Sequence, residues 1–216
     1  MARHITVSGS AEIQAAPDIA VVTLGVERMA TRASEARTGA AEAASRLLAV
    51  LREAGVEGKD IQTANITLQP QYDYNSGDGR TLRGYNASNS IAVTLRDLAR
   101  SGEVVDAALE ATGDAARMNG IRFGFANPAT LLERARRAAV ADARWRAETF
   151  ANAAGVALGE VLQIAEVPDT SGRPSPKGML EARALATPIE GGEESVSATV
   201  IVKFALERKA ARKKRG

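Results

Sequence analysis

The chain contains no cysteine, a single histidine and few aromatic side chains, and each shortage removes a class of chemistry. Without cysteine there is no disulfide, thiolate metal site or cysteine nucleophile. The only histidine, His4, lies close to the N-terminus, so serine–histidine–acid catalysis and a multi-histidine zinc site lack their residues. Chain termini are usually loosely held, which argues against a catalytic His4. The sequence therefore predicts no catalytic residue, no cofactor and no bound metal.

Long apolar runs are also missing. No stretch approaches the roughly 20 residues that a membrane-spanning helix needs. The N-terminal sequence MARHITVSGSAEI begins at once with a strand pattern and lacks the charged, apolar and small-residue series of a secretory signal. Two interpretations stay open: the protein is cytoplasmic, or a leader has been removed.

Positive charge is scarce outside the C-terminus. The net charge of +2 includes six cations in the last nine residues, which leaves residues 1–207 at −4. This mildly acidic body weighs against a nucleic-acid surface on the fold. The terminal RKAARKKRG could contact phosphates electrostatically, but we favour a disordered, solubilising tail over residues 207–216.

Apolar periodicity predicts an α+β fold. Period-two patterns predict strands near residues 4–15, 19–30, 59–72, 84–97, 116–127, 158–168 and 194–207. Patterns of three and four predict helices near residues 31–54, 98–113 and 128–154. The last helix starts with Asn127 as N-cap and Pro128 at the first position, and its apolar side is expected to hold Leu132, Ala135, Ala139, Ala143, Phe150 and Ala154. We expect one domain over residues 4–206, with two long helices and one shorter helix packed on a largely antiparallel sheet.

A short sequence repeat follows the two long predicted helices. Ala54-Gly55-Val56 and Ala154-Gly155-Val156 are identical, and both follow an alanine-rich helix and lead into a strand. Glycine after the last helical turn is a common helix stop, so chance likeness is one interpretation. A duplicated strand–helix–strand unit is the other, and the residues leave both open.

The passage QPQYDYNSGDGRTLRGYNASNS, residues 69–90, is the best candidate for a site. Asp73 begins a calcium-loop pattern that then fails at positions five, six and twelve of the loop. Asn, Ser, Asp and Gly in this order are typical of a hairpin turn, so we interpret the passage as a mobile flap. Its three tyrosines, together with the lone tryptophan, form a candidate interaction surface, although the tyrosines could instead cover a sheet edge. These residues are Tyr72, Tyr74, Tyr85 and Trp145.

A second long polar segment, residues 168–192, is rich in Pro, Gly and Ser. Loops longer than about 15 residues are usually either functional or disordered. We expect this loop to form a second contact surface in addition to the 69–90 hairpin.

The order of motifs resembles the SIMPL-domain (DUF541) family over about residues 4–206. The opening has the family's Val-x-Gly-x-Gly/Ala and Pro-Asp-x-Ala steps, with the family glycine at position 9. The passages that carry the resemblance are ITVSGSAEIQAAPDIAVVTLGVE, GVEGKDIQTANITLQPQYDY, GYNASNSIAVTLRDL, AAGVALGEVLQI and TPIEGGEESVSATVIVKFAL. The basic tail and the lack of a signal sequence depart from typical bacterial members.

The resemblance implies a bacterial protein of the periplasm or envelope, in a family that includes immunogenic periplasmic proteins and members linked to oxidative-stress tolerance. Animal relatives are kinase-associated adaptors. The family has no established catalytic residues to carry over. We therefore expect a non-enzymatic, self-associating envelope protein with a homo-oligomeric state and further protein partners. The alternatives are a small-molecule binder or enzyme that uses Asp73 and Tyr85 of the 69–90 hairpin, and nucleic-acid contact through the tail.

Overall fold

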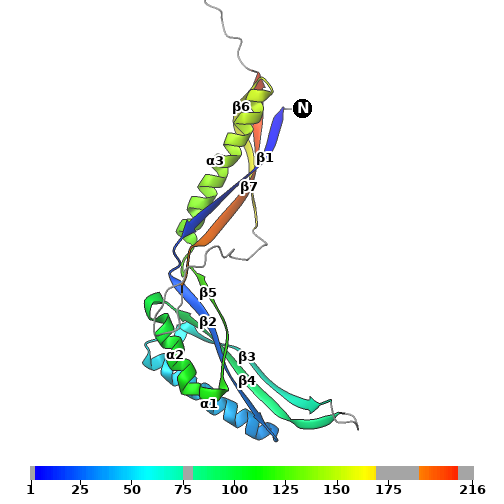
Figure 1. The fold of residues 1–216 in the computed structure, drawn as a ribbon. Helices are drawn as coiled ribbons and strands as arrows, with labels where there is room; N and C mark the ends of the chain where they lie inside the picture. The colour runs from blue at the N-terminus through cyan, green and yellow to red at the C-terminus, as the bar shows by residue number, and fades with distance from the viewer. Residues whose placement is uncertain (1–2, 75–79, 169–189, 209–216) are drawn as a thin grey trace, which may run out of the picture. The chain divides into compact units, whose positions relative to one another are not determined.

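The computed structural model describes residues 3–74, 80–168 and 190–208, and its α+β class confirms the expectation from sequence. The strands are β1 (His4–Ala15), β2 (Ile19–Ala30), β3 (Ile61–Asp73), β4 (Thr81–Leu95), β5 (Ala116–Gly124), β6 (Val156–Val167) and β7 (Glu194–Arg208). The α-helices are α1 (Ala33–Glu53), α2 (Ser101–Thr112) and α3 (Ala129–Ala153). Each lies where apolar periodicity placed it, to within a few residues (Figure 1).

The strands form two antiparallel sheets, and the chain forms two compact units around them. Unit 1 consists of residues 3–16, 127–168 and 193–208, and unit 2 of residues 17–74, 80–126 and 190–192. Unit 2 is thus inserted between the first strand and the helix of unit 1. Whether residues 4–206 behave as one domain remains a prediction.

Unit 1 is a three-stranded sheet of order β1-β7-β6 with α3 against one face. A stripe of alanines lets α3 approach the sheet closely, and the strands supply branched and aromatic side chains to the same core. The fully or nearly buried members of this core include Ala135, Ala139, Ala143, Ala147, Val200, Val202 and Phe204. Phe150 and Ala154 do not belong to the stripe: Phe150 is 59% exposed, and Ala147 and Ala151 take the buried positions.

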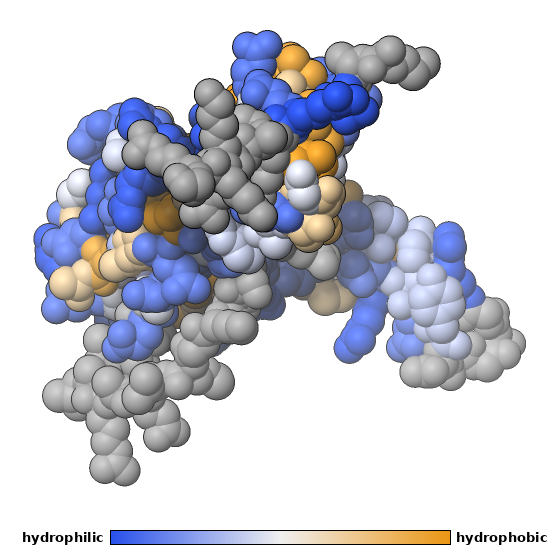
Figure 2. All heavy atoms as spheres, turned by 90° about the horizontal axis from the view of Figure 1, so that it is seen from above, coloured by the Kyte–Doolittle hydropathy of each residue, from blue (hydrophilic) through white to orange (hydrophobic). Residues whose placement is uncertain are grey.

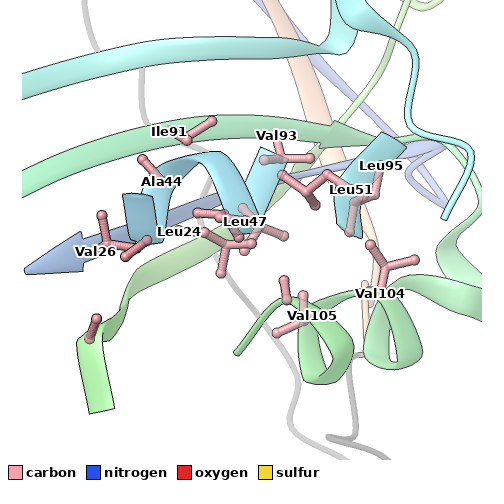
Figure 3. Packing of buried hydrophobic residues seen from close by; sticks show 14 of the residues in the cluster. Leu24, Val26, Ala44, Leu47, Leu51, Ile91, Val93, Leu95, Val104 and Val105 are labelled. Atoms are coloured by element: carbon pink, nitrogen blue, oxygen red, sulfur yellow. The ribbon is translucent and has the colours of Figure 1, made fainter. Parts of the chain in front are cut away.

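Unit 2 is a four-stranded sheet of order β3-β4-β2-β5, with a larger core beneath α1 and α2. Figure 3 shows Leu47 and Leu51 of α1 lying between side chains of β2 and β4, with Val104 and Val105 of α2 closing the cluster from below. Every second residue enters this core from Ala20 to Val26 of β2 and from Ile91 to Leu95 of β4, as expected for strands with one face covered.

The two units repeat one topology. In unit 2 the order β2-α1-β3-β4 gives a sheet with β4 between β3 and β2, and in unit 1 the order β1-α3-β6-β7 gives β7 between β6 and β1. Gly55 and Gly155 follow α1 and α3 with φ of 88° and 70°, a left-handed conformation that favours glycine. At α1 the stop is a Schellman motif, because Val56 N donates to Leu51 O at 3.0 Å. The short sequence repeat therefore falls on equivalent points of two similar units, in agreement with a duplication.

Candidate functional site

The hairpin of β3 and β4 extends beyond the rest of its sheet. Strand β2 ends at Ala30, which pairs with Tyr85 of β4, so the residues nearer the turn have no third strand beside them. Figure 1 shows this arm leaving the sheet. At its root the main chains approach closely, because a Cβ added at Gly84 would lie 2.5 Å from Ala30 O. Gly84 also has φ of 151°, so two constraints favour glycine here.

The three tyrosines of the predicted interaction surface have three different environments. Tyr85 is half-buried and packs on Ala36, Ala40 and Ala87, which anchors the root of the arm to α1. Tyr72 lies under the guanidinium of Arg80, 3.8 Å from the ring centroid, a cation–π contact across the hairpin. Only Tyr74 is largely free of packing, at 73% exposure. The turn residues 75–79, including Asn75 of the calcium-loop pattern, lie outside the described residues.

Two aliphatic side chains on β3 were missed by sequence reasoning. Ile66 is 69% and Leu68 44% exposed. Their partners on β4 are Asn89 and Ala87. Ala87 contacts α1, so cross-strand geometry places both aliphatic side chains on the α1 side of the sheet. Helix α1 packs mainly on β2 and β4, which leaves this strip of β3 uncovered. The alternation of polar and apolar residues in NITLQ was the available signal. It predicts that one face of the strand is buried, whereas in the fold this face stays exposed.

Trp145 lies on α3 of unit 1, away from the buried alanine stripe, and is 66% exposed. Together with Phe150, Arg146 and Thr149 it lines a shallow hollow of about 320 Å³. An exposed aromatic pair is unusual on a solvated helix and marks a candidate contact site. Figure 2 shows apolar side chains, in orange, among the hydrophilic ones on the surface.

A second hollow, of about 250 Å³, lies in unit 2 where α1 ends and β4 leads into α2. Its main polar feature is a two-point ion pair, in which Arg96 Nε and Nη2 donate to the Asp60 carboxylate at 2.8 and 2.7 Å. Asp60 is buried, and the Arg96 hydrogen bond holds its pKa below the ordinary value. The pair connects the residue before β3 to the residue after β4. We interpret it as a structural ion pair, since each charge already has its partner.

Carboxyl groups elsewhere are also held in the ionised form. Glu27 accepts hydrogen bonds from Arg117 Nε and Asn86 Nδ2, and the Arg117 bond is the main reason that its pKa is lowered. The pKa of Asp142 is lowered by the backbone N–H of Ser10 and then by Arg146. A general acid or base near pH 7 needs a raised carboxyl pKa, so these groups favour structural ion pairs over proton transfer.

Within residues 3–74, 80–168 and 190–208, no group of three or more His, Asp and Glu side chains is placed to hold a metal ion. In the same ranges, no helix combines the length and apolar character that crossing a bilayer requires. Most of the predicted contact loop 168–192 and of the basic tail lies outside the described residues.

Comparison with known proteins agrees with the resemblance seen in the sequence. The family model SIMPL, described as a protein of unknown function (DUF541), matches residues 5–204. The 26 kDa periplasmic immunogenic protein of Brucella melitensis is 36% identical over 218 residues, which cover 94% of this chain and 85% of that protein.

Two further relatives extend the range of organisms. The uncharacterized protein YggE of Escherichia coli K12 is 35% identical over 74% of this chain and 64% of its own length. The interleukin-1 receptor-associated kinase 1-binding protein 1 homolog of Xenopus laevis is 28% identical over 76% of this chain and 63% of its own length. Because the family model spans both units and nearly the whole chain, this protein belongs to the SIMPL (DUF541) family.

Proposed function

We propose that this chain is a non-enzymatic protein of the bacterial cell envelope that acts by binding protein chains, and that copies of itself are its first partner. The periplasmic name of the Brucella relative, at 36% identity over nearly the whole chain, supports the location. The downward pKa shifts of Glu27, Asp60 and Asp142 support a role without acid–base chemistry.

The observation that carries self-association is the exposure of large apolar side chains at two places. Tyr74 and Ile66 on the hairpin are 73% and 69% exposed, and Trp145 and Phe150 on α3 are 66% and 59% exposed. Aromatic side chains in particular are enriched at protein interfaces. Grouped exposed apolar side chains on a protein surface usually mark an interaction site or an aggregation hazard.

Sedimentation velocity and light scattering test the proposal directly. We expect a mass that is a multiple of the 22.6 kDa chain and that falls on dilution. A strict monomer at high micromolar concentration would contradict self-association.

A strain without the gene, exposed to peroxide, tests the link to stress tolerance that the family resemblance suggests. Survival equal to the wild type would remove that part of the proposal.

A further inference from the structure

The two sheets have four edge strands, and the edges differ in how they are protected. Unprotected edges present free backbone N–H and C=O groups to other chains, and proteins usually shield them with charge, bulges, short length or a covering element. The edges are β1 and β6 in unit 1 and β3 and β5 in unit 2.

Two of the four edges are shielded. On β1, the backbone N–H of Ser10 donates to Asp142 Oδ2 of α3 at 2.9 Å, so the helix occupies part of that edge. Strand β5 is short, pairs with β2 through an irregularity at Thr23/Leu24, and carries Arg117 and Arg122. Charges and a bulge of this kind discourage further pairing.

Strand β6 is intermediate. Its pairing with β7 is interrupted twice, and its regular stretch, from Gln163 to Val167, contains a charged residue, Glu166. That side chain is bound to Arg136 of α3 at 2.8 Å, which places a charged pair beside this edge.

Strand β3 has the longest uncharged stretch of the four edges, from Ile61 to Tyr72. Pro70 and the register shifts at Thr63/Asn65 and Gln71/Tyr72 protect it near its ends. Between the two shifts its pairing with β4 is regular, from Asn65 to Gln71, and the outer side of this stretch has no neighbouring strand among the described residues. Most of its side chains are exposed on both faces of the sheet. An uncharged strand of this length is the sort of edge that another strand extends.

The two faces of β3 also differ from each other. Ile66 and Leu68 lie on the α1 side, whereas Thr67 points to the other side, where its hydroxyl is 2.7 Å from that of Ser88. An antiparallel copy of the strand centred on Thr67 would place Ile66 opposite Leu68 of the second chain, and Leu68 opposite Ile66. The uncovered aliphatic strip of each copy would then cover that of the other.

From this geometry we infer that β3 pairs in antiparallel orientation with β3 of a second copy, so that the four-stranded sheets of two chains join into one. The pairing is self-complementary about a twofold axis, which is the commonest symmetry of protein dimers. The inference rests on the proposed self-association and names the surface that produces it. Because the axis is perpendicular to the sheet, both α1 helices lie on the same side, with the four aliphatic side chains between them.

Charge substitutions on the aliphatic strip give the first test. Ile66→Lys and Leu68→Lys place a cation on each side of the expected junction, and both positions are exposed enough for the chain to fold. We expect at least a tenfold rise in the dissociation constant measured by sedimentation. The matched control is Ile164→Lys on β6, 52% exposed, which should leave the constant unchanged.

Introduced cysteines give a second test that does not require the assembly to be broken. The natural chain has none, so a single substitution is the only thiol. We expect Thr67→Cys to form a disulfide-linked dimer under mild oxidation, and Asn65→Cys and Gln69→Cys to form less. Asn119→Cys, an exposed position on the shielded β5 edge, should form none. A maximum at one position identifies the twofold axis.

The outcomes separate this inference from the proposed function. An assembly that survives Ile66→Lys and Leu68→Lys but is weakened by Ile164→Lys overturns the β3 pairing and leaves self-association standing. Cross-linking that is strongest at Asn119→Cys, or equal at all four positions, also overturns it. A wild-type chain that is monomeric at high micromolar concentration overturns both.

Discussion

Gly9 of β1 lies directly beneath Ala143 of α3, so close that a Cβ added at Gly9 would fall 2.7 Å from Ala143 Cβ and 2.5 Å from Ala143 N. It would also clash with the carbonyl oxygen of Ala139. Helix and strand thus meet backbone to backbone, and the buried alanine stripe of α3 is the helix's half of that contact. The family glycine at position 9 therefore has a steric reason in this fold.

We expect Gly9→Val to lower the free energy of unfolding by about 3 kcal/mol, because overpacking a close contact displaces backbone as well as side chains. Urea denaturation measures the loss. Ser8→Val is the matched control, since Ser8 is the exposed neighbour on the other face of β1. Equal stability of the two variants would contradict the close approach of α3.

Replacing either of the two glycines that end the long helices should lower the free energy of unfolding by the same amount. At Gly55 and Gly155 nothing crowds an added Cβ, so the positive φ alone opposes substitution. We expect each Ala variant to lose about 1–2 kcal/mol, as measured by urea denaturation. Gly58→Ala, at a glycine with an equally open surrounding and no positive φ, should be close to neutral. If Gly58→Ala costs as much as the other two, the backbone conformation is not the cause.

Acid should weaken the protein partly through Asp60. Arg96 lowers the pKa of this carboxyl in the folded state, so the unfolded chain takes up its proton first as the pH falls. The stabilisation that the Asp60 carboxylate contributes is therefore complete above about pH 5. It is lost below about pH 4, as the pH falls toward the pKa of Asp60 in the folded protein. We expect Asp60→Asn to be less stable than the wild type at pH 7, with the difference shrinking toward pH 3 in thermal melts. Glu57→Gln, in an exposed pair with Lys59, should change little at either pH.

The lone tryptophan provides an intrinsic probe of the α3 surface. Trp145 is 66% exposed, so the dissociated chain should show the red-shifted emission and strong acrylamide quenching of an indole in water. If the hollow beside Phe150 takes part in association, raising the concentration should shift the emission to the blue and reduce quenching. Emission that stays constant across the association range would show that this face is left out of the assembly. Ile66→Lys serves as the control that removes association through β3.

Calorimetry tests whether residues 4–206 form one domain. In the sequence, most of unit 2 stands between β1 and α3 of unit 1, so unfolding of unit 2 would leave unit 1 closing a loop of about 110 residues. Such a loop costs on the order of 4 kcal/mol of entropy, which couples the two units. We expect one transition, lowered both by Gly9→Val in unit 1 and by Gly55→Ala in unit 2. Two transitions, each shifted by only one of the variants, would show independent units.

Local pattern was enough to place the helices and strands, because each long element has a clear period and strong stop signals. The start of α3 is an example: Asn127 Oδ1 accepts the Ala129 N–H at 3.0 Å, as its position before Pro128 predicts. The apolar stripe of α3 was harder. Phe150 fits the hydrophobic pattern but is exposed, and Ala147 and Ala151 take the buried positions around it. Elsewhere on the helix, at Ala139 and Ala143, the close approach of Gly9 admits only small side chains.

Pairing between distant strands could not be predicted from local pattern. Nothing in the alternation of residues 4–15 indicates that β7 would be its partner, and so one sheet was expected where the chain forms two. The tyrosines show the same limit. A register shift between Gln71 and Tyr72 changes which side chains share a face, so spacing alone did not separate the packed Tyr85 from the exposed Tyr74.

The insertion of unit 2 has a consequence for biosynthesis. Strand β1 pairs along its whole length with β7, from His4 opposite Ala205 to Ala15 opposite Glu194, so its partner is translated roughly 180–200 residues later. At about 5–20 residues per second, β1 leaves the ribosome on the order of ten seconds or more before β7 exists. The nascent chain must keep this first strand from pairing elsewhere while unit 2, which is nearly continuous in sequence, becomes available to fold.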